Sequence, residues 1–171
     1  MIQKIGSLGR YGGPILLDRI VTNSVTVAVG DSVKTVSGFA ALGTTGARVL
    51  GHVESIIGDD GLTPVKDGTY LGNIGEAFVA ASNNQTVAKV KVRVDIDTKS
   101  LYSAELDAAV GTTSAAGGSG AAGKTFDLDD EETLDESTSA ETMQQYYSHG
   151  VDRNNTDNVV VNILESEVFG F

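Results

Sequence analysis

Cysteine and tryptophan are absent from this sequence, and only two of its 171 residues are proline. Without cysteine the chain has no disulfide framework, no thiolate nucleophile and no zinc site built on sulfur. Aromatic residues make up 6% of the chain, which is few for the aromatic platforms that line a sugar-cleaving cleft. The stability of the fold must therefore come from packing or from assembly.

Basic residues are scarce as well. The chain has 12 lysines and arginines against 23 aspartates and glutamates, and its formal net charge is −11 at pH 7. Because binding to nucleic acid or to an anionic membrane needs a basic surface, this balance argues against both partners. The sequence has no run of about eighteen apolar residues, and its first residues lack the apolar stretch of a signal peptide. We expect a soluble product made in the cytoplasm.

One stretch matches a nucleotide-binding motif. Gly118 to Thr125 reads Gly-Ser-Gly-Ala-Ala-Gly-Lys-Thr, which is the pattern of a phosphate-binding loop. Such a loop needs a buried strand before it and a helix after it, because the helix directs its positive N-terminus at the phosphate. The preceding residues 108–117 contain a single β-branched apolar residue, and seven residues between Asp127 and Glu136 are acidic. A phosphate would be repelled by these carboxylates.

We therefore interpret Gly118, Gly123, Lys124 and Thr125 as a chance match within a flexible Gly- and Ala-rich loop, and we expect no cofactor. A nucleotide enzyme built on this stretch is kept as an alternative. It would require that the change Lys124→Ala abolish ATP binding.

No other pattern indicates a catalytic or metal site. His52 and His149 have no partner at metal-binding spacing; we expect His52 to face solvent or a polar neighbour, and His149 to lie near a helix end.

The acidic stretch from Asp127 to Glu136 lacks the glycine and the oxygen spacing of a calcium loop. We interpret it as a solvated face, and calcium binding stays open. No nucleophile elbow appears with a histidine to serve it. The sequence therefore predicts no catalytic residue and no metal, and we expect a protein that is not an enzyme.

Short valine-rich runs separated by turn residues fill the first hundred positions, and this spacing is typical of an antiparallel sandwich or barrel. The clearest signal is Ala88 to Asp97, where Ala88, Val90, Val92, Val94 and Ile96 alternate with charged residues. That pattern indicates a strand with one buried face and one solvent-exposed face. We expect strands at residues 15–21, 25–29, 32–36, 47–57, 62–65, 69–71, 77–81, 88–97 and 159–164.

The predicted fold class is mainly β: an antiparallel β-barrel or sandwich with one short helix and a long Gly/Ala-rich loop in the C-terminal third. Residues 1–102 form a β-rich body, residues 103–124 a flexible Gly/Ala/Ser loop or linker, and residues 125–171 an acidic segment, short helix and terminal strand that pack on the body. A capping box that begins at Thr138 places the helix at about Ser139 to Tyr147.

Two groups of residues are candidates for partner contact. Lys89, Lys91 and Arg93 form a basic face in an acidic chain; the simpler interpretation is a solvated strand face that discourages edge aggregation, and the alternative is docking to an acidic surface. The second group is the apolar carboxyl terminus, Val168, Phe169 and Phe171. Burying these side chains takes a sheet edge or a neighbouring chain.

Several stretches resemble a known family. Val27 to Val33 reads Val-Ala-Val-Gly-Asp-Ser-Val, Gly46 to Val53 reads Gly-Ala-Arg-Val-Leu-Gly-His-Val, and the valine-alternating strand Ala88 to Ile96 follows. This order is similar to the small β-rich decoration, or cement, proteins that bind the outside of tailed-bacteriophage capsids. The closing residues 158–171, with Glu-Ser-Glu-Val-Phe at 165–169, look like the terminal strand of such proteins.

The resemblance implies a structural virion protein that binds the major capsid protein on the capsid surface and stabilises the capsid, either alone or as a dimer or trimer. A negative charge suits the outward surface of such a protein, and placement on a lattice lets many weak contacts add. The alternative is a receptor- or glycan-binding module of a virion fibre or cell surface, which would show a concave aromatic or calcium-dependent site.

Overall fold

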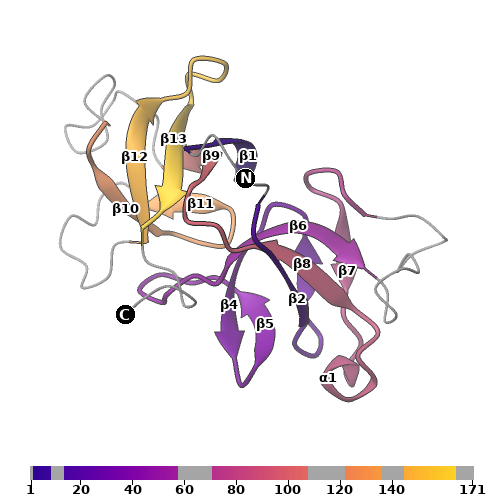
Figure 1. Ribbon diagram of the computed structural model, residues 1–171. Helices are drawn as coiled ribbons and strands as arrows, with labels where there is room; N and C mark the ends of the chain where they lie inside the picture. Colours follow the sequence, from indigo (N-terminus) through magenta and orange to yellow (C-terminus); the bar gives the residue numbers. More distant parts are fainter. Residues whose placement is uncertain (1, 9–13, 58–70, 108–121, 136–144, 165–171) are drawn as a thin grey trace.

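The strands of this chain form two barrel-like units that lie side by side (Figure 1). The structure is a computed structural model, and it describes residues 2–8, 14–57, 71–107, 122–135 and 145–164. The mainly β class predicted from the sequence is confirmed. Within the described residues, no helix has the length and apolar character needed to cross a membrane.

The first barrel is a five-stranded antiparallel sheet in the order β2-β8-β6-β4-β5. A parallel bridge joins Val21, just after β2, to Ala40 in β5, and the amide of Thr22 donates to the carbonyl of Ala40 at 2.8 Å. These contacts bring the two edges of the sheet together, so the sheet closes on itself. The strands are β2 (Leu16–Ile20), β4 (Ser32–Val36), β5 (Phe39–Leu42), β6 (Gly51–Ile57) and β8 (Lys91–Asp95).

A small antiparallel sheet and a helical turn complete this unit. The sheet pairs β3 (Thr26–Ala28) with β7 (Ala77–Val79), and the turn is α1 (Asn84–Val87). Asn84 is fully buried: its side-chain amide donates to the carbonyls of Val21 and Val90 at 2.7 and 2.9 Å, and its side-chain oxygen accepts from the amide of Val90. Asn84 thus ties the helical turn to β2 and to the start of β8.

The second barrel is closed by strand pairing alone. Its strands follow the order β9-β11-β10-β12-β13, and β13 pairs back onto β9. The amino-terminal strand β1 (Gln3–Ser7) adds to the first half of β9. The strands are β9 (Ser100–Leu106), β10 (Thr125–Leu128), β11 (Thr133–Asp135), β12 (Tyr146–Val151) and β13 (Asn158–Ile163).

Each barrel has its own apolar core, built by the period-two alternation of its strands. In β13, Val159, Val161 and Ile163 point inward and are fully buried, and in β8 the inward residues are Val92 and Val94. Full burial of such a side chain contributes roughly 1.5–3 kcal/mol. The core of the first barrel is Val21, Val27, Val29, Val33, Ala40, Leu50, Val53, Ile56, Leu71, Ala80, Val90, Val92, Val94 and Ile96.

The second barrel takes residues from the whole length of the chain. Ile2 and Val49 both lie in its core, beside Tyr102, Leu128 and Tyr146. Strand β9 runs through Leu106, so the boundary expected after residue 102 falls inside a strand. Of the loop expected over 103–124, residues 108–121 lie outside the described residues.

The helix predicted near residues 139–147 is wrong where the structure describes it. Tyr146 and Tyr147 begin β12, and Tyr146 pairs with both Phe126 and Ile163. Burial of the Tyr146 ring in the barrel core outweighs the local preference that a capping box expresses. The earlier part of that helix, residues 139–144, lies outside the described residues, as do the strand expected at 62–65 and most of the one at 69–71.

Gly51 lies where β6 passes closest to β8, and we expect the change Gly51→Ala to destabilise the fold. An added Cβ would overlap the carbonyl oxygen of Asp95 and lie 2.9 Å from Cγ1 of Val94. Overpacking of this kind costs roughly 1–3 kcal/mol, which corresponds to a fall in melting temperature of roughly 2–12 °C for a chain of this length. Gly6→Ala is the control, because a Cβ there meets no atom within 4 Å. Equal melting temperatures of the two variants in a thermal unfolding experiment would contradict this close approach.

Candidate functional site

The two barrels meet at a buried polar junction on the outer face of β6 and β8. His52 in β6 pairs in register with Asp95 in β8, and both side chains are buried. The facing side chains come from the second barrel: the ring centroids of Tyr102 and Tyr146 lie 4.2 and 5.7 Å from that of His52. The imidazole is therefore enclosed between a strand of its own barrel and two rings of the other.

Hydrogen bonds connect His52 to both barrels. Its Nδ1 lies 3.3 Å from Oγ of Ser32, its Nε2 lies 3.2 Å from the hydroxyl of Tyr146, and these two hydroxyls are 3.0 Å apart. Burial lowers the pKa of His52 to about 4, although the nearby carboxylate of Asp95 and a backbone hydrogen bond with Gly30 act in the opposite direction. The ring is therefore neutral at neutral pH. Ser32 is fully buried as well.

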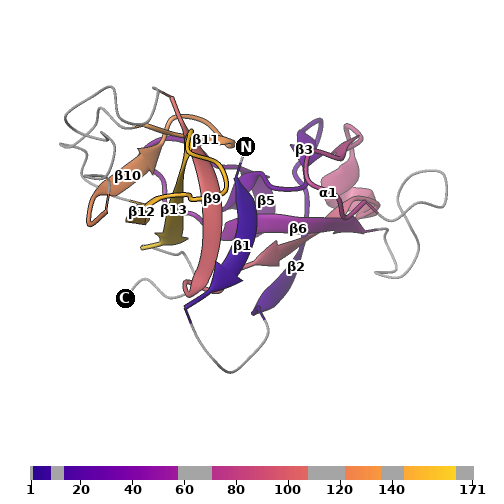
Figure 2. The same cartoon turned by 90° about the horizontal axis from the view of Figure 1, so that it is seen from above.

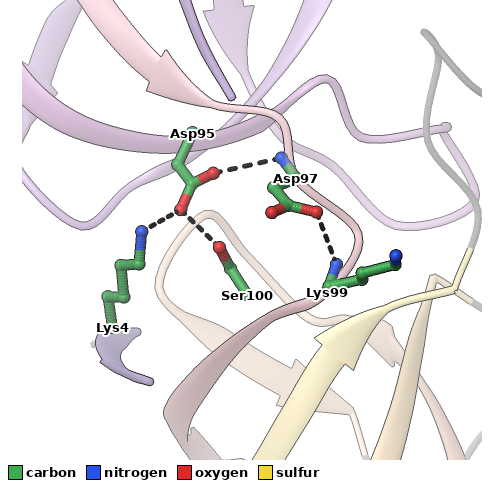
Figure 3. Close-up of polar contacts among 5 residues, drawn as sticks. All are labelled: Lys4, Asp95, Asp97, Lys99 and Ser100. Atoms are coloured by element: carbon green, nitrogen blue, oxygen red, sulfur yellow. Dashed lines mark hydrogen bonds and ion pairs between the residues drawn. The ribbon is translucent and has the colours of Figure 1, made fainter. Parts of the chain in front are cut away.

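Asp95 accepts three hydrogen bonds at the junction (Figure 3). Its Oδ2 accepts from Nζ of Lys4 at 2.6 Å and from Oγ of Ser100 at 2.7 Å, and its Oδ1 accepts from the amide of Asp97 at 3.0 Å. Lys4 belongs to β1 and Ser100 to β9. The second barrel thus supplies both side-chain donors to a buried carboxylate of the first.

The connection between β5 and β6 adds further links between the barrels. The amide of Gly46 donates to Oδ2 of Asp127 at 2.9 Å, the hydroxyl of Thr45 donates to the carbonyl of Leu128 at 2.7 Å, and the side-chain amide of Gln145 donates to the carbonyl of Ala47. The same connection carries Val49 into the core of the second barrel. Backbone and side-chain contacts therefore join the barrels at several points.

A cleft of about 440 Å³ opens beside the junction. Tyr102 lines it, and the hydroxyl of Tyr102 is buried and has no hydrogen-bond partner. Burial raises the pKa of Tyr102 well above its ordinary value, and the charge of Asp95 adds to this effect. Asp95 and Ser100 lie near the phenol, but their geometry does not complete a hydrogen bond with it. The cleft is also lined by the polar residues Lys4, His52, Glu54 and Asp95 and by the apolar residues Ile2, Val29, Val53 and Ile74.

A second hollow, of about 480 Å³, is acidic and also lies between the barrels. Asp31, which precedes β4, lines it together with Glu131 and Glu132 from the turn between β10 and β11. Burial raises the pKa of Asp31 to about 7; a hydrogen bond from the amide of Ala28 works against this, and the charges of Glu132, Glu131 and Asp130 add to it. The described residues contain no group of three or more histidine or carboxylate side chains placed to hold a metal ion.

The acidic stretch 127–136 is not simply a solvated face. Asp127 is buried and accepts from the amides of Gly46 and Leu128. Asp130 organises the turn, because its Oδ1 accepts from the amides of Glu132 and Thr133 and from the Thr133 hydroxyl. Partial burial acts to raise the pKa of Asp130, but these hydrogen bonds outweigh it and the pKa is lowered. These carboxylates therefore serve as hydrogen-bond acceptors within the fold.

The basic residues predicted from the sequence lie on the first barrel and away from the cleft lining. Lys89 is exposed, and Lys91 and Arg93 are half-buried on β8. Strand β8 lies between β2 and β6 and is not an edge strand. The interpretation that these basic side chains discourage aggregation at a sheet edge is therefore wrong. Arg93 instead forms an ion pair with Asp18 of β2, with Nε to Oδ1 at 3.0 Å. Val168, Phe169 and Phe171 lie outside the described residues.

The end of the phosphate-loop match enters a strand. The amide of Gly123 donates to the carbonyl of Ser148, the amide of Ser148 donates to the carbonyl of Lys124, and Thr125 is the first residue of β10. A phosphate-binding loop would continue into a helix at this point. Gly118 lies outside the described residues.

Four exposed apolar side chains occur where β1 ends and β2 begins, and we call them the N-terminal apolar patch: Ile5, Leu8, Ile15 and Leu16, which are 46%, 54%, 48% and 39% exposed. The amide of Leu8 donates to the carbonyl of Lys99, and the amide of Ile96 donates to the carbonyl of Ile15. Both segments therefore flank the turn that connects β8 to β9. Figure 2 shows β1 and β2 reaching the same side of the molecule.

The patch adjoins a strand edge. Ile5 is an extra residue in β1, since Lys4 pairs with Tyr102 and Gly6 pairs with the next residue, Leu101. Such a bulge turns the side chain of the extra residue out of the ladder. Strand β1 ends the order of its sheet, and its second edge has no partner strand among the described residues. Exposed apolar side chains and an open edge therefore lie together.

The sequence did not predict the junction. His52 was expected to face solvent or a polar neighbour; the structure encloses it against polar and aromatic neighbours from the other barrel. No local pattern in the sequence marks the other residues of the junction, which are Ser32, Asp95, Tyr102 and Tyr146. The one available signal was the charge of Asp95 at the end of the valine-alternating strand.

The chain matches no family model, no curated protein and no solved structure. A functional inference therefore depends on the residues described above and on the resemblance in the sequence.

We expect the stability that His52 contributes to fall on acidification. The folded-state pKa is about 4 and the unfolded value is about 6.5, so the unfolded chain binds more protons between these pH values and stability is lost as the pH falls. The difference in unfolding free energy between the wild type and His52→Gln should shrink by up to about 3 kcal/mol from pH 6.5 to pH 4. Urea denaturation measures it. His149→Gln, at an exposed position, is the control, and a constant difference for His52→Gln would contradict the burial of a neutral ring.

Asp31 should have the opposite effect. Its folded-state pKa is about 7 and the unfolded value is about 3.9, so the folded chain binds more protons and stability is lost as the pH rises from 4 to 7. We expect the stability of Asp31→Asn relative to the wild type to increase over this range and to level off above pH 7. Asp157→Asn, which changes an exposed carboxylate, is the control. A pH-independent difference for Asp31→Asn in the same urea titrations would overturn the assignment.

Proposed function

We propose that this chain is a structural virion protein that binds the outer surface of a tailed-phage capsid and stabilises it, with the major capsid protein as its partner and without a catalytic step. The observation that carries the proposal is the N-terminal apolar patch beside the open edge of β1. Exposed apolar clusters next to an unpaired strand edge are typical of protein docking surfaces. The resemblance of residues 25–96 to capsid decoration proteins supports the same role.

The arrangement of the barrels supports a docking role of this kind. The patch lies on segments that are held to the barrel junction, because Lys4 of β1 binds Asp95 and Leu16 of β2 pairs in register with the same residue. Side chains on such segments lose little freedom on binding, which reduces the cost of association. A rigid two-barrel body is therefore suited to present a fixed contact face to a lattice.

The expected affinity of one copy is modest. Full burial of a large apolar side chain contributes roughly 1.5–3 kcal/mol, and the four patch residues are already about half covered. What remains is partly offset by the entropy lost on association. A capsid presents many equivalent sites, and contacts between neighbouring copies would add to each single contact. Weak individual binding is thus compatible with a stable coat.

The charge of the chain fits an outward surface. A net charge of −11 keeps particles apart in suspension. Lys89, Lys91 and Arg93 remain candidate contacts to an acidic capsid surface, and Val168, Phe169 and Phe171 remain candidate apolar contacts. Assembly as a dimer or trimer is an open part of the proposal.

Co-sedimentation tests the proposal. We expect the purified protein to pellet with mature capsids prepared from the encoding phage without this protein. Leu8→Asp and Leu16→Asp should each weaken binding by about tenfold or more, since a charge in an apolar contact costs at least about 1.4 kcal/mol. Val79→Asp is the matched control, because Val79 is 61% exposed but lies in the small sheet.

The outcomes separate the role from the contact face. Failure of the wild-type protein to pellet would reject the capsid role. Equal binding of Leu8→Asp, Leu16→Asp and Val79→Asp would reject the N-terminal apolar patch as the contact and leave the basic face or the carboxyl terminus to be tested. A melting temperature close to that of the wild type is required of each variant.

A further inference from the structure

The hydroxyl of Tyr102 is the least satisfied polar group at the barrel junction. The residue is 1% exposed, its hydroxyl has no hydrogen-bond partner, and it lines the cleft of about 440 Å³ between the barrels. A buried hydroxyl without a partner costs roughly 1–3 kcal/mol. Asp95 and Ser100 lie near the phenol, but Oδ2 of Asp95 already accepts from Lys4 and Ser100, and neither residue completes a hydrogen bond with the hydroxyl. A molecule that enters the cleft can supply the missing acceptor.

The walls of the cleft favour a ligand with an apolar body. The apolar residues Ile2, Val29, Val53 and Ile74 line the cleft from four different segments, and Ile74 is the exposed one among them. Ligand sites in proteins combine such walls with a few placed polar groups, and their volumes are roughly 300–1,000 Å³. The cleft falls in this range. It is large enough for a ring of six heavy atoms with one polar substituent, since benzene already fits a cavity of about 150 Å³.

The charges around the cleft disfavour an ion. Lys4 and Asp95 neutralise each other in a 2.6 Å ion pair, and the imidazole of His52 is neutral when buried. An anion would face the carboxylates of Asp95 and Glu54, and a cation would compete with Lys4 for Asp95. An uncharged oxygen avoids both penalties and accepts a hydrogen bond from the phenol.

We propose that the cleft between the barrels is a binding site for a small uncharged molecule that carries a hydroxyl or carbonyl oxygen on an apolar body, with Tyr102 as the hydrogen-bond donor. This site is separate from the N-terminal apolar patch and does not depend on the capsid role. Ile74 lies at the cleft and is 40% exposed, so its side chain borders the entrance. Tyr102 and His52 form the polar floor.

Cyclohexanol is a suitable probe, and backbone amide NMR shifts of the full chain measure its binding. We expect saturable shifts at Gly72, Asn73 and Ile74, with a dissociation constant on the order of 1 mM for a ligand of this size. Cyclohexanecarboxylate and cyclohexylammonium have the same ring but carry a charge. They should bind at least about tenfold more weakly.

Two variants test the assignment of residues. Tyr102→Phe keeps the ring and removes the hydroxyl, and it should raise the dissociation constant of cyclohexanol by about fivefold or more. Without ligand, the same variant should be as stable as the wild type or more stable, because an unpartnered buried hydroxyl is removed. Ile74→Trp should block the entrance and abolish the shifts, whereas Val79→Trp, at an exposed site in the small sheet, should leave them unchanged.

The proposal is overturned by any of three results. The first is the absence of saturable shifts in the wild-type protein. The second is equal affinity of the wild type and Tyr102→Phe, or a marked loss of stability in Tyr102→Phe, which would mean that the hydroxyl already has a partner. The third is binding of either charged probe as tightly as cyclohexanol. Capsid co-sedimentation is unaffected by these outcomes, so failure here is distinguishable from failure of the proposed function.

Discussion

Among the contacts that join the two barrels, the buried carboxylate of Asp95 constrains their relative placement. A charge removed from water is costly unless hydrogen bonds compensate for it, and removing one partner of such a pair typically costs 3–5 kcal/mol. Asp95 belongs to the first barrel, but its two side-chain donors, Lys4 and Ser100, belong to strands of the second. The first barrel therefore leaves this charge unsatisfied unless the second is docked on it in one orientation. A buried charge can specify geometry in this way even where it adds little net stability.

Several other features follow from that docking. His52 is paired in register with Asp95, so docking also covers the histidine and brings it to the hydroxyl of Tyr146. Tyr102 lies beside Asp95, but its hydroxyl completes no hydrogen bond. Lys4 also fixes β1, and with it the bulge that turns Ile5 outward. The junction, the cleft and the N-terminal apolar patch are thus consequences of the same contact.

Sequence reasoning succeeded where the signal was local and periodic. The alternation of Val90, Val92 and Val94 correctly indicated a buried face of β8. The charged face was expected to be exposed to solvent throughout, yet Asp95 is buried. The sequence pattern could not predict this burial, because the strands that cover Asp95 are distant in sequence. The same reason explains the missed histidine site: Tyr146 lies 94 residues from His52. The capping box before residue 139 was also a local signal, and it predicted a helix that reaches Tyr146. In the structure Tyr146 instead belongs to a strand that pairs with β10 and β13. Local patterns report which face of a strand is apolar, but not what later packs on the other face.

His52 and Asp31 both lie between the barrels, and they change stability with pH in opposite directions. Between about pH 4 and pH 7 the folded chain keeps His52 neutral and Asp31 protonated, so neither buried position carries a charge. The unfolded chain changes protonation at both: it gains protons at the histidine as the pH falls and loses them at the aspartate as the pH rises. The resulting slopes of stability have opposite signs over the same range. Over this range the loss of stability that one group causes is therefore opposed by the other. This holds only while both remain buried, and their burial depends on the docking that Asp95 directs.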